Sequence, residues 1–124
     1  MTARVLVVDD ILSNVKLLEA KLSAEYFEVS TAFNGLECLA RMEEIIPDIV
    51  LLDITMPTMN GLDAARILKR EFPAMHVVIV SQHDSRGFQW AALAAGASGY
   101  VVKSNAAQDL LPEVRRIQNL RMSA

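Results

Sequence analysis

Short apolar segments alternate along this chain with longer segments of helical periodicity, and this alternation constrains the fold more than any other feature. Each short segment is rich in Val and Ile and apolar at consecutive positions, as expected of a strand that helices cover on both faces. Five such segments occur, at residues 4–9, 27–32, 48–53, 76–81 and 99–103. The pattern predicts a parallel five-stranded sheet.

The intervening segments have apolar residues three and four positions apart, which predicts amphipathic crossover helices. This spacing is seen in three sets: Val15, Leu18 and Leu22; Leu36, Leu39 and Met42; and Leu62, Ala65, Leu68 and Phe72. Residues 86–96 and 106–119 supply a fourth and a fifth helix. The order is therefore (βα)₅, an α/β fold with a doubly wound parallel sheet, for which we expect the strand order 2-1-3-4-5.

Length and composition narrow the classes of protein. The 124 residues suit a single domain, 1–124, with a core at about 4–119 and a polar-leaning tail at 120–124. A net charge of -3 gives no electrostatic case for direct nucleic-acid binding. Apolar stretches of about six residues are too short to span a membrane. We expect a cytoplasmic protein, in which Cys38, the only cysteine, is a buried or half-buried helix residue.

Polar side chains end four of the five predicted strands. Asp9 and Asp10 end the first, Asp53 the third, Ser81 the fourth and Lys103 the fifth. Ligands of doubly wound sheets bind beyond the carboxyl ends of the strands, so these side chains are expected to share one crevice. Each alone has a structural explanation as a cap or turn residue, but their joint position indicates a site.

Three carboxylates in one crevice repel one another unless a cation joins them. With oxygen ligands and neither His nor Cys in the cluster, the donor set predicts Mg²⁺, with Mn²⁺ as the alternative, rather than zinc. His76 and His83 are not expected to be ligands. Lys103 suits a phosphate oxygen, Ser81 suits a donor to a phosphoryl oxygen, and Asp53 suits a nucleophile toward phosphorus.

Four motifs carry a resemblance to a known family: "VLVVDD", "DIVLLDITMPTMNG", "VVIVS" and "AGASGYVVKS". In this order and spacing they resemble the receiver domain of two-component response regulators over roughly 4–119, a flavodoxin-like fold. The resemblance implies phosphorylation of Asp53 by a partner histidine kinase or phosphotransfer protein. It also implies Mg²⁺ held by Asp10, Asp53 and the backbone carbonyl of Thr55, with Asp9 acting through water.

The resemblance also implies a switch. Ser81 would move toward the phosphoryl group and Tyr100 would turn inward, which changes the surface of the fourth helix, fifth strand and fifth helix for a downstream protein or output domain. A homodimer that forms on phosphorylation is a further expectation. Trp90 and Phe88 lie beside that surface, and docking or core packing remains open for both.

Residues around the acceptor have implied supporting roles. Pro57 and Gly61 would shape the loop after Asp53, the glycine by adopting a backbone conformation that other residues resist. Thr55 and His83 would flank the path of the hydrolytic water. Such a protein would catalyse its own phosphorylation and dephosphorylation without being a conventional enzyme.

The sequence departs from the family's pattern at Ser104. Many receivers have a proline after the lysine, in a cis peptide, whereas a cis bond before a non-proline costs roughly 2.5–4 kcal/mol. We therefore expect a trans bond. In addition, residues 5–32 resemble receivers attached to diguanylate cyclases and residues 96–111 those of helix-turn-helix regulators, which leaves the output, the kinase and the signal undecided.

Two other functions would also fit parts of this pattern. A receiver-like module that binds a partner without phosphorylation is disfavoured by the presence of Asp9, Asp10, Asp53, Ser81 and Lys103. A phosphohydrolase of the haloacid dehalogenase kind is less favoured, since that family has a second aspartate two residues after the nucleophile, where this chain has Thr55. No G-x-G-x-x-G follows the first strand, which disfavours a dinucleotide-binding enzyme.

Overall fold

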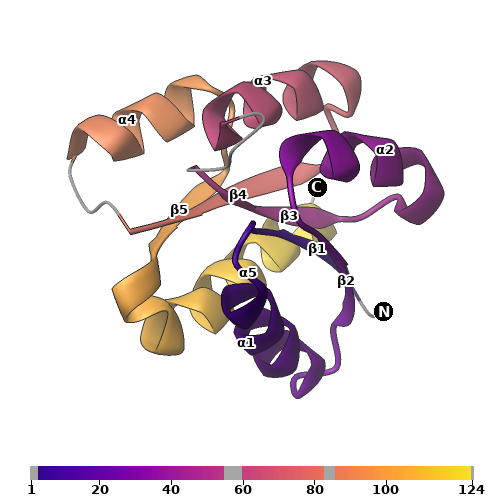
Figure 1. Ribbon diagram of the computed structural model, residues 1–124, viewed down its shortest axis with the longest axis vertical. Helices are drawn as coiled ribbons and strands as arrows, with labels where there is room; N and C mark the ends of the chain where they lie inside the picture. Colours follow the sequence, from indigo (N-terminus) through magenta and orange to yellow (C-terminus); the bar gives the residue numbers. More distant parts are fainter. Residues whose placement is uncertain (1–2, 55–59, 83–85, 124) are drawn as a thin grey trace.

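The computed structural model describes residues 3–54, 60–82 and 86–123, and side chains to residue 120. Within these ranges five strands and five α-helices alternate, as the sequence predicts (Figure 1). The strands are β1 (Arg4–Val8), β2 (Glu28–Ala32), β3 (Ile49–Asp53), β4 (His76–Ser81) and β5 (Gly99–Val102); the helices are α1 (Leu12–Ser23), α2 (Gly35–Ile45), α3 (Gly61–Glu71), α4 (Arg86–Ala94) and α5 (Ala106–Ser123).

The strands form one parallel sheet in the order β2-β1-β3-β4-β5, which confirms the predicted topology. Figure 1 shows α2, α3 and α4 on one side of the sheet and α1 and α5 on the other. Consecutive residues of β1 serve the two sides in turn: Leu6 and Val8 belong to the core beneath α2 and α3, and Val5 and Val7 to the core beneath α1 and α5. Burial of both faces explains why β1, β3 and β4 have runs of consecutive apolar residues, whereas β2, at the edge of the sheet, also carries Glu28, Ser30 and Thr31.

Helix ends follow local sequence signals in most places. Asn34 and Asn60 cap α2 and α3 by accepting hydrogen bonds from the backbone N–H three residues on. Gly96 has φ +100° just after α4, as expected of a glycine that ends a helix. Helix α5 continues to Ser123, beyond the expected end at residue 119.

One core assignment was wrong. Leu36 is 58% exposed, although its spacing placed it with Leu39 and Met42 on the buried side of α2. Cys38 takes the inward position instead and is fully buried, which confirms the expectation for that residue. Burial raises the pKa of the Cys38 thiol to about 12.

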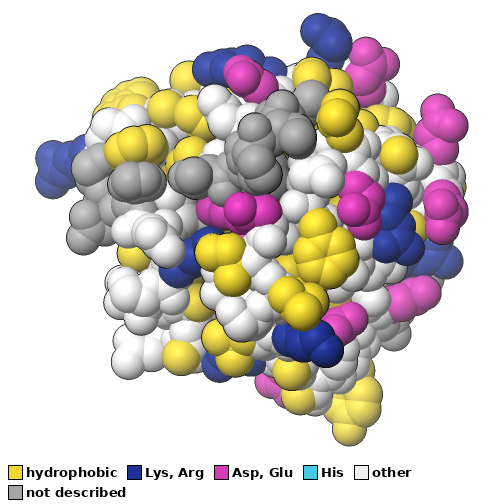
Figure 2. Space-filling model, viewed as in Figure 1, with side chains coloured by type: hydrophobic (Ala, Val, Ile, Leu, Met, Phe, Trp, Pro, Cys, Tyr) yellow, Lys and Arg dark blue, Asp and Glu magenta, His cyan; other side chains and the backbone are white. Residues whose placement is uncertain are grey.

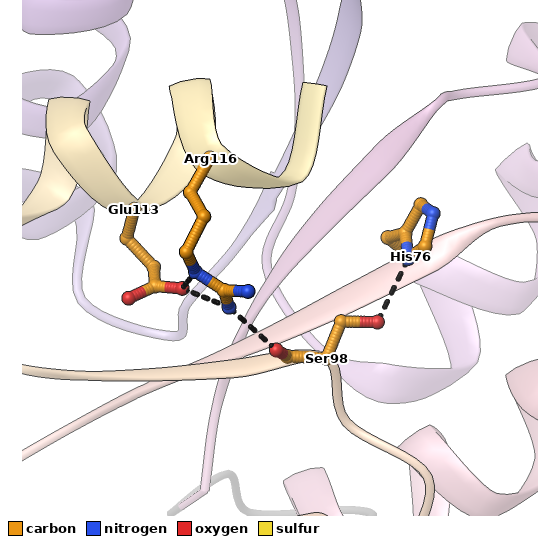
Figure 3. A network of polar contacts seen from close by, with 4 residues as sticks. All are labelled: His76, Ser98, Glu113 and Arg116. Carbon is orange, nitrogen blue, oxygen red and sulfur yellow. Dashed lines mark hydrogen bonds and ion pairs between the residues drawn. The ribbon is translucent and has the colours of Figure 1, made fainter. Parts of the chain in front are cut away.

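A polar network fixes α5 against the amino end of β5 (Figure 3). Arg116 Nη2 donates to the carbonyl oxygen of Ser98 at 2.8 Å, and Arg116 Nε donates to Glu113 Oε1 at 2.7 Å. The Ser98 hydroxyl shares a 2.8 Å hydrogen bond with His76 Nδ1. His76 is therefore engaged at the edge of the sheet opposite to the strand ends that carry the carboxylates.

Candidate functional site

The carboxyl ends of β1, β3, β4 and β5 bring the predicted polar residues to one edge of the sheet. Asp9 directly follows β1, and its N–H still bonds to the carbonyl of Ala32 at the end of β2. Asp53 and Ser81 are the last residues of β3 and β4, and Lys103 is the first residue after β5. Asp9, Asp53 and Ser81 are 1%, 6% and 1% exposed, which is unusual for aspartates.

Lys103 joins the two buried carboxylates of the site, those of Asp9 and Asp53. Its Nζ lies 2.9 Å from Asp9 Oδ2 and 3.5 Å from Asp53 Oδ1. The lysine side chain is 16% exposed, so this ion pair is screened far less than a surface pair. The contact with Asp9 is the shorter of the two, a preference that the sequence pattern did not indicate.

Asp9, Asp10 and Asp53 form a cluster in which one oxygen of each lies within 4.8 Å of the others. Two oxygens that bind one Mg²⁺ directly, at about 2.1 Å, are at most about 4.2 Å apart, which is close to the 4.8 Å within which the oxygens of the cluster lie. Hard oxygen donors are the set that Mg²⁺ or Mn²⁺ prefers. The donor set therefore fits such an ion with small adjustments or an intervening water.

The three aspartates differ in their surroundings. Both oxygens of Asp9 are engaged, since Oδ1 accepts from the N–H of Ile11 at 3.0 Å while Oδ2 faces Lys103. Asp10 is exposed, lies just ahead of α1 and contributes one carboxylate oxygen to the cluster. Of the two aspartates that follow β1, Asp10 is thus the better placed to give an oxygen to an ion.

Gly61 allows α3 to begin directly against the end of β3. Its N–H donates to the carbonyl of Ile54 at 2.8 Å, and a Cβ at this position would lie 2.1 Å from the carbonyl oxygen of Asp53. Among described glycines only Gly96 has a positive φ, so the role expected of Gly61 needs correction: it provides space, not an unusual conformation. Thr55, Pro57 and His83 lie outside the described residues.

The residues expected to report phosphorylation sit on β4 and β5. Ser81 is buried, while Tyr100 is half-buried and packs against the core beneath α2, α3 and α4. On α4, Phe88 packs against the same core, whereas Trp90 is 70% exposed. Core packing therefore accounts for Phe88 and does not account for Trp90.

The backbone after Lys103 is regular. No cis peptide bond occurs in the described parts of the chain, which confirms the trans bond expected before Ser104. Lys103–Asn105 form a short 3₁₀ turn that leads into α5. This turn lets the chain reverse direction just after the lysine has reached the carboxylates.

Sequence reasoning missed a set of exposed apolar side chains beside the carboxylates. Ile11 and Leu12 follow Asp10 directly and are 44% and 53% exposed, and Phe33, next to the end of β2, is 38% exposed. Figure 2 shows hydrophobic side chains on this face over α1 and beside β2. The available signal was the Ile-Leu pair at the start of a helix, where polar capping residues are usual.

Comparison with known proteins identifies the family. The family model described as "Response regulator receiver domain" matches residues 5–115. Response regulator PleD of Caulobacter vibrioides is 44% identical over 98% of this chain, which spans only 27% of PleD. A CheY-like receiver domain from Methanospirillum hungatei superimposes with a TM-score of 0.92 at 27% identity, covering 99% of this chain and 98% of that one.

A second solved structure carries ligands. The response regulator TrrA of Thermotoga maritima, in complex with Mg²⁺ and BeF, has a TM-score of 0.84 at 32% identity and covers 94% of this chain and 99% of its own. No helix in the described ranges is long and apolar enough to cross a membrane. With its matched sequence, parallel sheet and acidic cluster, this chain belongs to the response regulator receiver domain family.

Proposed function

We propose that this domain accepts a phosphoryl group on Asp53 from a histidine kinase or phosphotransfer protein. The observation that carries the proposal is the contact of Lys103 Nζ with Asp53 Oδ1, beside an acidic cluster on three strand-end aspartates. A lone structural ion pair would not need two further carboxylates. The buried position of Asp53, 6% exposed, also gives an acceptor in which water competes poorly with a docked donor.

In the proposed reaction a carboxylate oxygen of Asp53 attacks phosphorus as the bond from phosphorus to the donor's nitrogen breaks, and the donor's imidazole leaves. Lys103 Nζ then moves from the carboxylates and pairs with a phosphoryl oxygen. The residues that would hold Mg²⁺, or Mn²⁺, are Asp10, Asp53 and the Thr55 carbonyl, with Asp9 acting through water. When bound, the ion supplies positive charge that offsets the charge of the phosphoryl oxygens.

The proposed output is a change in the surface of α4, β5 and α5. Ser81 donates to the phosphoryl group, and Tyr100 turns further into the core on which it already packs. The exposed Trp90 belongs to the surface that would meet a downstream protein or output domain. We also propose that the phosphorylated domain forms a homodimer and that it catalyses its own dephosphorylation. That the protein is cytoplasmic, and that residues 1–124 form a single domain, remain predictions.

Apolar side chains offer a docking surface for the donor protein. Ile11, Leu12 and Phe33 are exposed, and Ile11 and Leu12 directly follow Asp10 of the acidic cluster, so a donor protein that brings its histidine to Asp53 can contact them. Burying such side chains against a partner releases about 25 cal/mol for each Å² of apolar area, which supports transient association.

Intact mass measurement after incubation with acetyl phosphate and Mg²⁺ tests the proposal. The parent and Asp63→Asn, an exposed control on α3, are expected to gain one phosphoryl group, and Asp53→Asn none. Asp10→Asn is expected to slow the gain because it removes a carboxylate from the proposed ion site. Absence of an adduct on the parent would favour the module that binds without phosphorylation, and an equal adduct on Asp53→Asn would move the acceptor elsewhere.

Light scattering tests the expected dimer with beryllofluoride and Mg²⁺ in place of the phosphoryl donor. An increase in mass toward that of two chains is expected. An unchanged monomer would remove dimerisation from the proposal without affecting phosphorylation.

A further inference from the structure

The dipeptide Asn-Gly occurs twice in the chain, each time at the start of a helix. Asn34 and Asn60 are the N-cap residues of α2 and α3, and Gly35 and Gly61 are the first helical residues. An asparagine side chain is most open to attack by the following backbone nitrogen when the next residue is glycine, which has no side chain to obstruct the approach. Both pairs are therefore chemically suited to spontaneous deamidation.

The asparagine side chains are held in the same way at the two sites. Asn34 Oδ1 accepts a hydrogen bond from the N–H of Glu37 at 2.8 Å. Asn60 Oδ1 accepts one from the N–H of Asp63 at 3.0 Å. Each donor faces the oxygen on which negative charge builds when the side-chain carbon is attacked. The helix N-terminus also favours negative charge on the attacking nitrogen.

The attacking nitrogens differ in their hydrogen bonds. The first N–H groups of a helix have no partner within the helix, so the N–H of each glycine needs a partner elsewhere. Gly61 N–H donates to the carbonyl of Ile54 at 2.8 Å. Gly35 N–H makes no hydrogen bond to another residue in the described ranges. The Gly61 nitrogen must therefore give up a hydrogen bond before it can react, and the Gly35 nitrogen need not.

Close packing adds a second restraint at Gly61. A Cβ placed there would lie 2.1 Å from the carbonyl oxygen of Asp53 and 2.8 Å from Ile54 Cα, so the backbone of Gly61 is in tight contact with the end of β3. Attack requires the peptide between Asn60 and Gly61 to turn until its nitrogen approaches the Asn60 side chain. Such a turn displaces backbone atoms that are already in contact.

Solvent exposure alone would give the opposite order of reactivity. Asn60 is exposed, whereas Asn34 is half-buried. If access to water set the rates, Asn60 would react first. If the freedom of the glycine nitrogen sets them, Asn34 reacts first. The order of the two rates therefore distinguishes the two causes.

We propose that Asn34 is a site of spontaneous deamidation in the folded domain and that the fold protects Asn60 from the same reaction. The Gly35 nitrogen loses its proton to hydroxide and bonds to Asn34 Cγ; the bond from Cγ to Nδ2 breaks, and Nδ2 takes up a proton and leaves as ammonia. Water then opens the succinimide ring at either of its two carbonyl carbons, which gives aspartate or isoaspartate. The proposal does not depend on phosphorylation of Asp53.

The aspartate product adds a negative charge to the edge of the sheet that carries the acidic cluster. Asn34 lies two residues beyond Ala32, whose carbonyl accepts a hydrogen bond from the N–H of Asp9. Aspartate caps a helix as well as asparagine does, so this product keeps the start of α2 in place. The isoaspartate product inserts a carbon into the backbone between the cap and the helix, and it therefore disturbs the cap.

Peptide mapping by mass spectrometry tests the proposal on the unaltered chain. The protein is incubated at mildly alkaline pH in water enriched in heavy oxygen, which labels only the products formed during the incubation. After digestion, electron-transfer fragmentation separates aspartate from isoaspartate. We expect Asn34 to react at least about fivefold faster than Asn60, because a buried backbone hydrogen bond must break only at the second site.

The same incubation in urea that unfolds the chain is the matched control. Both pairs then lack tertiary contacts, so Asn60 is expected to react at a rate similar to that of Asn34. Gly35→Ala is expected to suppress reaction at Asn34, folded or in urea, and to leave Asn60 unchanged. Equal or faster reaction at Asn60 in the folded chain, an undiminished rate difference in urea, or absence of isoaspartate at Asn34 would each overturn the proposal.

Discussion

Replacement of Gly61 by alanine tests whether close packing behind Asp53 shapes the phosphoacceptor. The added Cβ would lie 2.1 Å from the carbonyl oxygen of Asp53 and 2.8 Å from both the Asp53 carbonyl carbon and Ile54 Cα. The oxygen contact is about 1.3 Å short of 3.4 Å, where ordinary contact begins, and all three neighbours are backbone atoms that cannot rotate away. The start of α3 and the end of β3 must therefore separate.

Overlap of this kind costs about 3 kcal/mol, and alanine regains up to about 1 kcal/mol by restricting the unfolded chain. We expect Gly61→Ala to lower the free energy of unfolding by about 2 kcal/mol. Urea unfolding followed by far-UV circular dichroism measures this change, and the fluorescence of Trp90, the only tryptophan, gives a second probe of the same transition.

Gly99→Ala is the matched control. A Cβ there would meet Glu113 Oε1 at 2.8 Å, the far end of a flexible side chain that can move aside. We expect this variant to remain within about 1 kcal/mol of the parent. Because the Gly61 change displaces Asp53, folded Gly61→Ala should also be phosphorylated more slowly by acetyl phosphate, unlike Gly99→Ala. Equal stability of the two variants would refute the packing argument.

Two further predictions concern Lys103 and Cys38. Lys103→Met leaves buried Asp9 and Asp53 without the Lys103 cation, so we expect its free energy of unfolding in the presence of a chelator to fall by about 2–4 kcal/mol. In urea titrations, Mg²⁺ is expected to restore more stability to this variant than to the exposed control Lys16→Met, and equal responses to Mg²⁺ would contradict the prediction. Burial raises the pKa of the Cys38 thiol from 9.0 to about 12, so on raising the pH the unfolded chain loses the thiol proton before the folded chain does. The free energy of unfolding is therefore expected to fall as the pH rises from 9 toward 12, by up to about 1.4 kcal/mol per pH unit. Urea unfolding between pH 8 and 10 should show a shallower decline for Cys38→Ala, and parallel pH profiles would exclude this contribution.

The sequence alone determined the elements and their order. Strands at 4–9 and 48–53 were predicted within one residue because a strand buried on both faces must be apolar throughout, a signal that is local. Once these strands are parallel, Asp9, Asp53 and Lys103 must reach the same edge. The composition of the site therefore followed from the pattern, while the resemblance supplied the roles of its residues.

Only the tertiary structure decided which atoms meet. It placed Lys103 nearer to Asp9 than to Asp53, and it showed that Gly61 is needed for space, because both facts depend on how segments distant in sequence approach each other. It also turned Cys38 inward and Leu36 outward on one helix, a rotation that spacing alone leaves open. A pocket between the α2–β3 and α3–β4 loops, lined by Ile46 and Phe72 among others, arises in the same way, since the two loops are far apart in the chain and neither has a sequence signal for the other.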